Sequence, residues 1–247
     1  MSDVGELDPT RLPIRQGLDR EVQRAWSRLA APGTWWTGEE RVAIAAEGRN
    51  ARSCRLCTQR KEALSPYTVR GDHDSQGALA QPIVEVVHRI VTDAGRLKES
   101  WVRSMVTNGV TEEQYVEIVG IVALVTALDT FDHALGRAVR PLPASAPGKP
   151  RKARPAGAKR GLAWVHTVAP QDLTTDDPDP YAVHGEKNIH RALSLVPQEV
   201  FNFFDLDVEL YLKDDEIRAF GTEHRALTHA QIEMLAARVS ALNGCYY

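Results

Sequence analysis

The sequence predicts an all-α protein, and three observations support this fold class. Apolar residues of its longer periodic stretches recur at helical spacing, and threonines stand in capping-box spacing before three of these stretches. No stretch alternates strictly enough between apolar and polar residues to favour a strand. With 247 residues, 43% of them apolar and 26% charged, the chain can bury one large core or two modest ones. Antiparallel helices joined by short loops are the expected architecture.

Composition and the N-terminal segment exclude several classes of function. The formal charge of −3 gives no overall reason to expect binding to nucleic acid or to an anionic membrane. The first residues, MSDVGELDPTRLPIRQ, contain acids and prolines where a signal peptide has a basic start and an apolar core. Three cysteines, an odd number, do not form a disulfide scaffold. We therefore expect a cytoplasmic protein with no nucleic-acid or membrane partner.

The helices of the first half are predicted by their caps and periods. Thr37 precedes Glu40 in capping-box spacing and opens a helix that leads towards a pair of cysteines. The stretches VEVVHRIVTDAG (84–95) and LKESWVRSMVTNG (97–109) are typical of short amphipathic helices, because each ends in an Asp or Asn and Gly signal.

The stretch from Thr111 to Gly136 predicts the central helix. Thr111 and Gln114 stand in capping-box spacing, the apolar residues that follow lie nearly all round the helix, and Gly136 marks its end. Its apolar run, Ile118–Leu128, is too short to cross a bilayer. We therefore expect a buried helix.

The segment 141–161, PLPASAPGKPRKARPAGAKRG, predicts a linker. It has five prolines, six basic residues and no acid, so it has no apolar face to bury and stays extended. The favoured interpretation of its basic residues is solubility, with a docking site for an acidic partner as the alternative. The linker divides the chain into a unit at 18–140 and a second unit at 162–247.

An internal repeat relates the two units. Thr37 and Thr228 each precede a Glu or Gln by three positions, and each stands 17 residues before a cysteine, Cys54 or Cys245. An Ala-Ala pair follows at the same place in both segments, so the offset is 191 throughout. This pattern predicts a duplication in which a capped helix delivers a cysteine to the start of the next helix.

Cys54 and Cys57 form a CxxC pair at this helix start. A helix N-terminus stabilises the reactive thiolate, and cysteines separated by two residues stand one helical turn apart and can form a disulfide, so thiol–disulfide chemistry is the favoured interpretation. A metal site is disfavoured because there is no second CxxC and the eight histidines are scattered; simple buried thiols remain an alternative. Nearby basic residues add positive charge: Arg52, Arg55, Arg60 and Lys61.

The stretch SCRLCTQRKEALSPY, followed by GDHD and VEVVHRIVTDAGRL, is similar to the alkylhydroperoxidase-related branch of the alkylhydroperoxidase D and carboxymuconolactone decarboxylase superfamily, which includes selenocysteine members. The resemblance covers about residues 26–138 and 190–247. It implies a helical bundle of the alkylhydroperoxidase D type with two related units, of which the second is truncated at its C-terminus.

The first unit departs from the family's proton-relay motif. The family places a glutamate twelve residues before the first cysteine and a histidine four residues after the second, where this chain has Val42 and Lys61. Glu47 is the nearest carboxylate on that helix and could replace the base, although a solvated helix face is an equal alternative. His73, in GDHD, could reach the site from a following loop, although a turn or capping role is favoured.

The second unit shows the reverse pattern. Glu233 stands at the family's glutamate position relative to Cys245, but the sequence stops at Tyr247, before a second cysteine. A UGA selenocysteine codon read as a stop would explain that end. The apolar face formed by Leu235, Val239 and Leu242 would then be covered by dimerisation or by packing against the first unit.

The resemblance implies a thiol-dependent peroxidase or disulfide oxidoreductase. Cys57 would attack the peroxide, Cys54 would resolve the sulfenic acid as a disulfide, and a dithiol would reduce the pair. The expected partners are a hydroperoxide substrate, a dithiol reductant and further copies of the chain in a homo-oligomer, and no metal or organic cofactor is required. The alternatives are a non-redox carboxymuconolactone decarboxylase-like enzyme and a non-catalytic interaction protein.

Overall fold

The all-α class is confirmed. The computed structural model describes residues 12–161 and 163–245; 56% of the chain is helical, and the described residues contain no strand, only an isolated bridge between Lys159 and Thr167. The longer helices are α1 (Gln16–Ala30), α2 (Gly38–Ala51), α3 (Arg55–Glu62), α4 (Gln81–Asp93), α5 (Glu99–Thr107), α6 (Glu112–Ala134), α9 (Pro197–Leu210) and α11 (His229–Leu242). Three short helices complete the second half: α7 (Tyr181–His184), α8 (Asn188–Ala192) and α10 (Asp214–Arg218).

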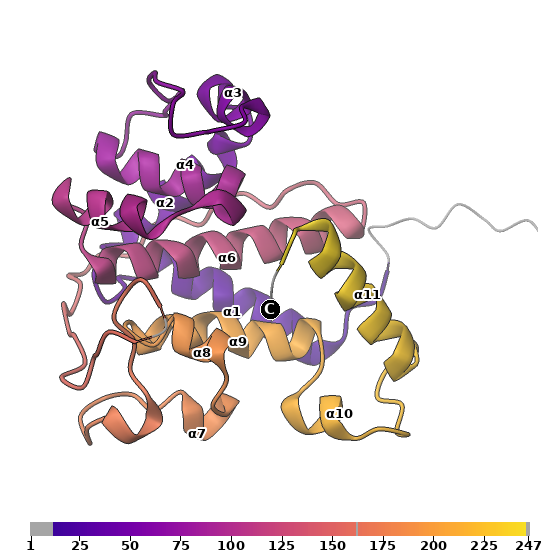
Figure 1. The fold of residues 1–247 in the computed structure, drawn as a ribbon. Coiled ribbons are helices and arrows are strands. Elements are labelled where there is room, and N and C mark those ends of the chain that lie inside the picture. Colours follow the sequence, from indigo (N-terminus) through magenta and orange to yellow (C-terminus); the bar gives the residue numbers. More distant parts are fainter. Residues whose placement is uncertain (1–11, 162, 246–247) are drawn as a thin grey trace, which may run out of the picture.

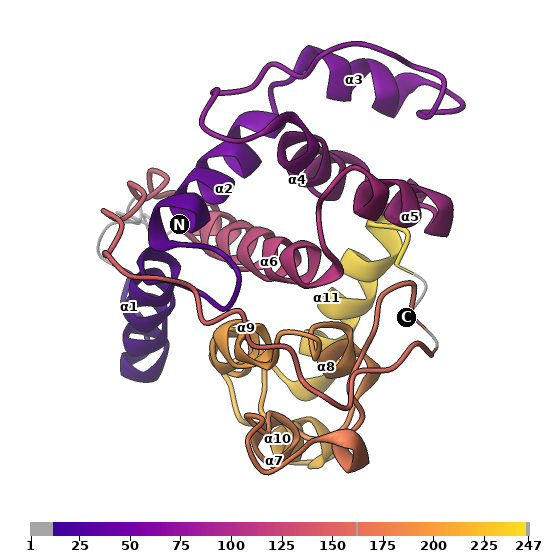
Figure 2. The same cartoon turned by 90° about the vertical axis from the view of Figure 1, so that its left-hand side faces the viewer.

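Helix α6 is the centre of the fold. It runs between α2 and α4 on one side and α1 and α9 on the other (Figures 1 and 2). The predicted capping box of Thr111 and Gln114 is present, and Gly136 follows the helix with a φ of 66°. By length and composition α6 could also cross a membrane, but 56% of its most apolar window is buried inside the protein, as in a core helix.

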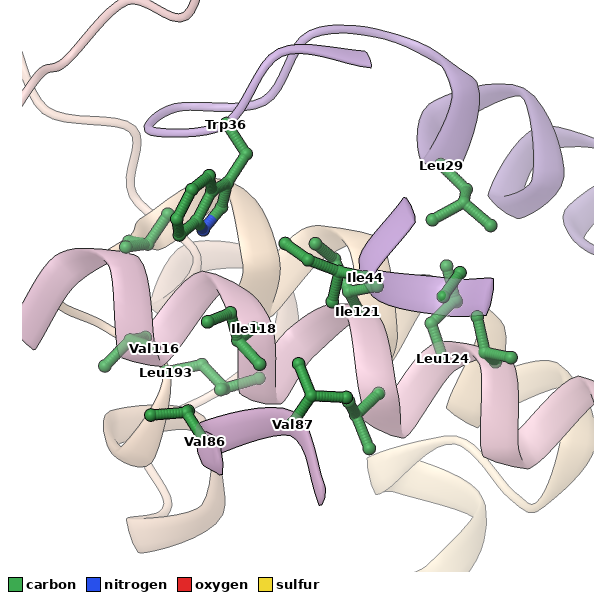
Figure 3. Packing of buried hydrophobic residues seen from close by; sticks show 14 of the residues in the cluster. Leu29, Trp36, Ile44, Val86, Val87, Val116, Ile118, Ile121, Leu124 and Leu193 are labelled. Carbon is green, nitrogen blue, oxygen red and sulfur yellow. The ribbon is translucent and has the colours of Figure 1, made fainter. Parts of the chain in front are cut away.

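One hydrophobic core takes residues from both sides of the predicted linker. Ile44 of α2 and Val87 of α4 pack around Ile118 and Ile121 of α6, and Leu193, from the second half, lies in the same cluster (Figure 3). Helix α9 also packs along α1 and α6. The division into two units stays a prediction, but the two halves share this core.

The predicted linker is extended and lies against the first half. The N–H of Ala146 donates to the Ala30 carbonyl at 2.8 Å. Arg160 pairs with Glu112 at 2.6 Å, and Arg154 pairs with Glu113. Each of these two arginines thus pairs with a glutamate in the first turn of α6, a contact that the sequence did not predict, and the solubility interpretation of the basic residues stays a prediction.

A buried charge cluster ties three helices together. Arg41 of α2, 1% exposed, donates to Glu199 of α9 at 2.8 Å and also pairs with Glu117 of α6. Burial and the neighbouring Glu199 carboxylate raise the pKa of Glu117 to about 7. The cluster fixes α2 against the core at the end opposite to the cysteines.

Helix α11 lies at the edge of the fold (Figure 1), and several of its apolar side chains are exposed. Its predicted capping box of Thr228 and Gln231 is present, as is that of Thr37 and Glu40 in α2. Leu235, Val239 and Leu242 are 52%, 57% and 68% exposed. Packing of this face against the first unit is therefore not observed, and dimerisation stays a prediction. The predicted chain end at Tyr247 lies outside the described residues.

Candidate functional site

The two cysteines of the CxxC pair lie side by side at the start of α3, just after the end of α2. Cys54 is the N-cap of α3 and Cys57 lies in its first turn, as the sequence predicts. The two sulfurs are 3.7 Å apart, and the residues are only 1% and 4% exposed. A small movement of either side chain would bring the sulfurs to the bonding distance of a disulfide.

His73 reaches both sulfurs from the loop between α3 and α4. Its Nδ1 lies 3.5 Å from the Sγ of Cys54 and 3.5 Å from the Sγ of Cys57. The capping role belongs to its neighbour Asp74, whose carboxylate accepts the backbone N–H of Arg55 at 2.9 Å. The interpretation of His73 as only a turn or capping residue is therefore wrong.

His88 of α4 completes the cluster, and the sequence reasoning missed it. Its Nδ1 lies 3.3 Å from the Cys57 sulfur, its Nε2 lies 2.8 Å from the Glu47 carboxylate, and the residue is fully buried. The available signal was its place in the apolar face of the 84–95 stretch, where a histidine needs a polar partner.

Glu47 is a buried group of the site. Only 1% exposed, it accepts hydrogen bonds from His88 at 2.8 Å, from the Asn50 amide at 2.9 Å and from the backbone N–H of Gln76 at 3.0 Å. Although burial opposes ionisation, these hydrogen bonds lower the pKa of Glu47. The solvated helix face that the sequence allowed is therefore excluded.

A second carboxylate serves His73 in the same way. Glu85 of α4 lies 2.7 Å from the Nε2 of His73, and Arg60 pairs with Glu85 at 2.8 Å. Burial opposes ionisation of Glu85, but the bonds with His73 and Arg60 outweigh it and bring its pKa to about 2. Each imidazole is thus held between a carboxylate and a sulfur.

These contacts push the pKa values of the two histidines apart. Burial opposes the charged form of His73, but hydrogen bonds with Cys57, Glu85 and Cys54 outweigh it and raise its pKa to about 10. Burial, helped by the positive charge of His73, lowers the pKa of His88 despite the bond with Glu47. Near neutral pH the site therefore holds one imidazolium and one neutral imidazole.

The Cys54 thiol is also perturbed. Burial raises its pKa, but the backbone N–H of Cys57 and the hydrogen bond with His73 outweigh burial and lower it. The basic residues cited from the sequence contribute less than predicted. Arg55 pairs with Asp74 at 2.7 Å and Arg60 with Glu85, so acids neutralise both.

The second-half candidates lie elsewhere. Cys245 is exposed, and α11, which precedes it, lies apart from α3 in both views (Figures 1 and 2). The Glu233 carboxylate accepts a hydrogen bond from the Tyr211 hydroxyl at 2.5 Å. The fold therefore brings together Cys54, Cys57, Glu47 and His73, with His88 added, and leaves Glu233 and Cys245 outside this cluster.

The cluster also has the donor set of a metal site. The two sulfurs and the facing nitrogens of His73 and His88 all lie within 4.8 Å of one another. The sequence argument that scattered histidines disfavour a metal fails here, because the loop and α4 bring two of them to the cysteines.

Comparison with known proteins identifies no relative. No family model matches the chain, and neither curated proteins nor solved structures give a significant match.

Proposed function

We propose that the protein is a thiol-dependent peroxidase in which Cys57 is oxidised by a hydroperoxide and Cys54 resolves the product as a disulfide. The observation that carries the proposal is a buried series of hydrogen-bond contacts from Glu47 through His88 to Cys57. The second thiol, Cys54, lies 3.7 Å from Cys57. A nucleophile, a base and a group that orients the base are the parts that activated cysteines require.

The first step oxidises Cys57. The Cys57 thiol gives its proton to Nδ1 of His88, and the Glu47 carboxylate at Nε2 stabilises the imidazolium. The thiolate attacks the terminal oxygen of the hydroperoxide, so an S–O bond forms as the O–O bond breaks. The leaving alkoxide takes the proton from His88 and departs as an alcohol, and Cys57 is left as a sulfenic acid.

The second step forms the disulfide. The Cys54 thiolate attacks the Cys57 sulfur, the S–O bond breaks, and the released hydroxide takes a proton to become water. His73 contacts both sulfurs as an imidazolium and is placed to give that proton. A dithiol donor then reduces the disulfide through two exchange reactions and becomes a disulfide itself.

The different surroundings of the two thiols support this division of roles. Cys57 contacts the imidazole that Glu47 orients. Cys54 contacts His73 and lies at the N-cap of α3, where the backbone N–H of Cys57 favours its thiolate. A thiolate beside the sulfenic acid is the group that resolves it most readily.

A cavity next to the site offers space for the organic part of a hydroperoxide. It encloses about 430 Å³ and is bordered by Arg60 and Glu85, both of which contact His73. Arg70 and Arg89 also line it. An organic hydroperoxide with a carboxylate therefore suits the cavity better than an uncharged one.

Peptide mapping tests the proposal. One equivalent of hydrogen peroxide is added to the reduced full-length chain, free thiols are alkylated, and the peptides are identified by mass spectrometry. We expect a Cys54–Cys57 disulfide that dithiothreitol reverses, with Cys245 alkylated. A non-redox enzyme or an interaction protein would leave both cysteines of the pair alkylated, and that result would overturn the proposal.

A further inference from the structure

We propose that the reduced chain binds one Zn²⁺ ion through the sulfurs of Cys54 and Cys57 and the Nδ1 atoms of His73 and His88. These four donors come from the start of α3, the following loop and α4, and all lie within 4.8 Å of one another. Two thiolates and two imidazoles are a ligand set typical of four-coordinate zinc. Zinc binding does not depend on the proposed peroxidase activity.

Four of the six distances between the donors are close to those around a tetrahedral ion, and the other two, from His88 to Cys54 and to His73, are at most 4.8 Å. Bonds of about 2.3 Å to sulfur and about 2.0 Å to nitrogen place two sulfur ligands about 3.8 Å apart, and a sulfur and a nitrogen about 3.5 Å apart. The two sulfurs are 3.7 Å apart. The sulfur–nitrogen distances are 3.5 Å from His73 to each cysteine and 3.3 Å from His88 to Cys57.

The outer contacts of the histidines also fit zinc ligands. The Nε2 of His88 lies 2.8 Å from Glu47 and that of His73 lies 2.7 Å from Glu85. A carboxylate that accepts the Nε2 proton directs Nδ1 of a neutral imidazole to the metal, and metal-binding histidines typically have such a partner. Zinc would displace the Nδ1 proton that His73 carries in the metal-free chain. The two ring centroids are 4.2 Å apart, and both Nδ1 atoms lie within 3.5 Å of the Cys57 sulfur.

The proposed site is closed. All four ligands come from this chain, and the cysteines and His88 are at most 4% exposed, which leaves no coordination position for a substrate. Two thiolates neutralise the charge of Zn²⁺, which suits a buried position. We therefore infer that the ion holds the reduced thiolates in place and takes no part in peroxide chemistry.

Zinc and peroxide then compete for the same sulfurs. Two zinc-bound thiolates that meet hydrogen peroxide lose two electrons and form the disulfide, while the peroxide O–O bond breaks and gives two hydroxide ions. The disulfide sulfurs are no longer thiolate ligands, so the ion is released. We expect one zinc ion to be released for each Cys54–Cys57 disulfide that forms.

The test measures metal directly on the full-length chain. Reduced protein is loaded with Zn²⁺, passed over a desalting column and analysed by mass spectrometry for metal, and we expect about one ion per chain. Co²⁺ in place of Zn²⁺ should give the absorption of a tetrahedral site with sulfur ligands. One equivalent of hydrogen peroxide should release the zinc to a chromogenic chelator, together with the Cys54–Cys57 disulfide.

Variants locate the site. Cys57→Ser should abolish binding, and Cys245→Ser should bind like the unaltered chain, because that exposed cysteine lies outside the cluster. Glu85→Gln keeps all four ligands and should weaken zinc binding about 10–100-fold, with unchanged helical circular dichroism. Its side chain is 34% exposed, so the substitution leaves the core intact.

The outcomes separate the two proposals. Zinc bound at one ion per chain, with no peroxide turnover by the metal-free protein, would overturn the peroxidase and keep the zinc site. Turnover with no bound metal above the level of Cys57→Ser would overturn the zinc site and keep the peroxidase. Loss of zinc in Cys245→Ser with retention in Cys57→Ser would also overturn this assignment.

Discussion

The same sequence pattern occurs twice in this chain and has two different outcomes. Helices α2 and α11 both begin with a threonine capping box, and each stands before a cysteine at the same spacing. Helix α2 ends at a buried cluster of two thiols and two histidines, whereas α11 ends at an exposed cysteine. The local pattern thus specifies a capped helix, and the residues packed against that helix decide whether a site forms.

Equivalent positions of α2 and α11 differ in how far their side chains are exposed. Ile44 of α2 is 0% exposed, while Leu235, its counterpart in α11, is 52% exposed. Arg41 of α2 is anchored by two buried glutamates from α6 and α9. After Cys54 the chain continues through a loop and α4, which supply His73 and His88.

The largest expected effect is on turnover. Cys57→Ser should abolish peroxide consumption, and Cys54→Ser should allow one oxidation that is not recycled, because the resolving thiol is missing. Cys245→Ser should keep the rate of the unaltered chain. The assay follows peroxide with dithiothreitol as reductant. Equal residual turnover in Cys54→Ser and Cys57→Ser would remove the assignment of roles.

The second prediction compares the two glutamates. Glu47→Gln should lower kcat by about 10²-fold or more, because the base His88 loses the carboxylate that stabilises its charged form. Glu233→Gln should leave the rate unchanged, since its carboxylate bonds Tyr211 and not a thiol.

A readout beyond activity separates this positioning role from a general loss of structure. The rate at which iodoacetamide alkylates Cys57 near neutral pH should fall in Glu47→Gln, with an unchanged circular dichroism spectrum. An unaltered alkylation rate together with full turnover would show that the carboxylate has no part in the relay.

The third prediction uses the equivalent apolar positions. Ile44→Ala should lower the free energy of unfolding by about 2–5 kcal/mol, because it removes a fully buried side chain and leaves a cavity. Leu235→Ala should change it by less than about 0.5 kcal/mol, because the residue is half exposed. Urea titrations followed by circular dichroism measure both. A large loss for Leu235→Ala would indicate that α11 is covered in solution, as dimerisation predicts.

The fold was predictable to a large extent because its signals are local. Capping boxes at Thr37, Thr111 and Thr228 and the glycine end of α6 depend on residues within a few positions of one another, and all are observed. The packing of the second half onto α1 and α6 was not predictable in this way. The sequence predicts that the basic residues of the 141–161 segment are solvated, because the acidic partners of Arg154 and Arg160 lie in α6, far away in the sequence.

The site was predictable in part for the same reason. The spacing of Cys54 and Cys57 is enough to identify them as a candidate pair. His88 is separated from Cys57 by 31 positions and reaches it only through the packing of α4 on α3. The sequence identified Glu47 as a candidate but not the residue that it contacts, and the structure shows that this residue is His88. The family motif misleads here, because its two relay positions are occupied by Val42 and Lys61.

The smallest expected effect concerns how α2 is anchored, a feature that α11 lacks. Burial and the neighbouring Glu199 raise the pKa of Glu117 to about 7, above its ordinary value of about 4.5. The folded state therefore keeps a proton that the unfolded chain releases at lower pH. The stability from this group is fully present below about pH 4.5 and is lost as the pH rises through about 7, by at most about 3 kcal/mol.

Glu117→Gln tests this anchoring, since glutamine imitates the protonated carboxyl. We expect the free energy of unfolding of the unaltered chain to fall from pH 5 to pH 8 by more than that of Glu117→Gln. The difference isolates Glu117, because the histidines of the site titrate in both proteins. Arg41 attracts the ionised carboxylate, and the pKa of about 7 already includes this attraction. Parallel pH profiles for the two proteins would contradict the raised pKa.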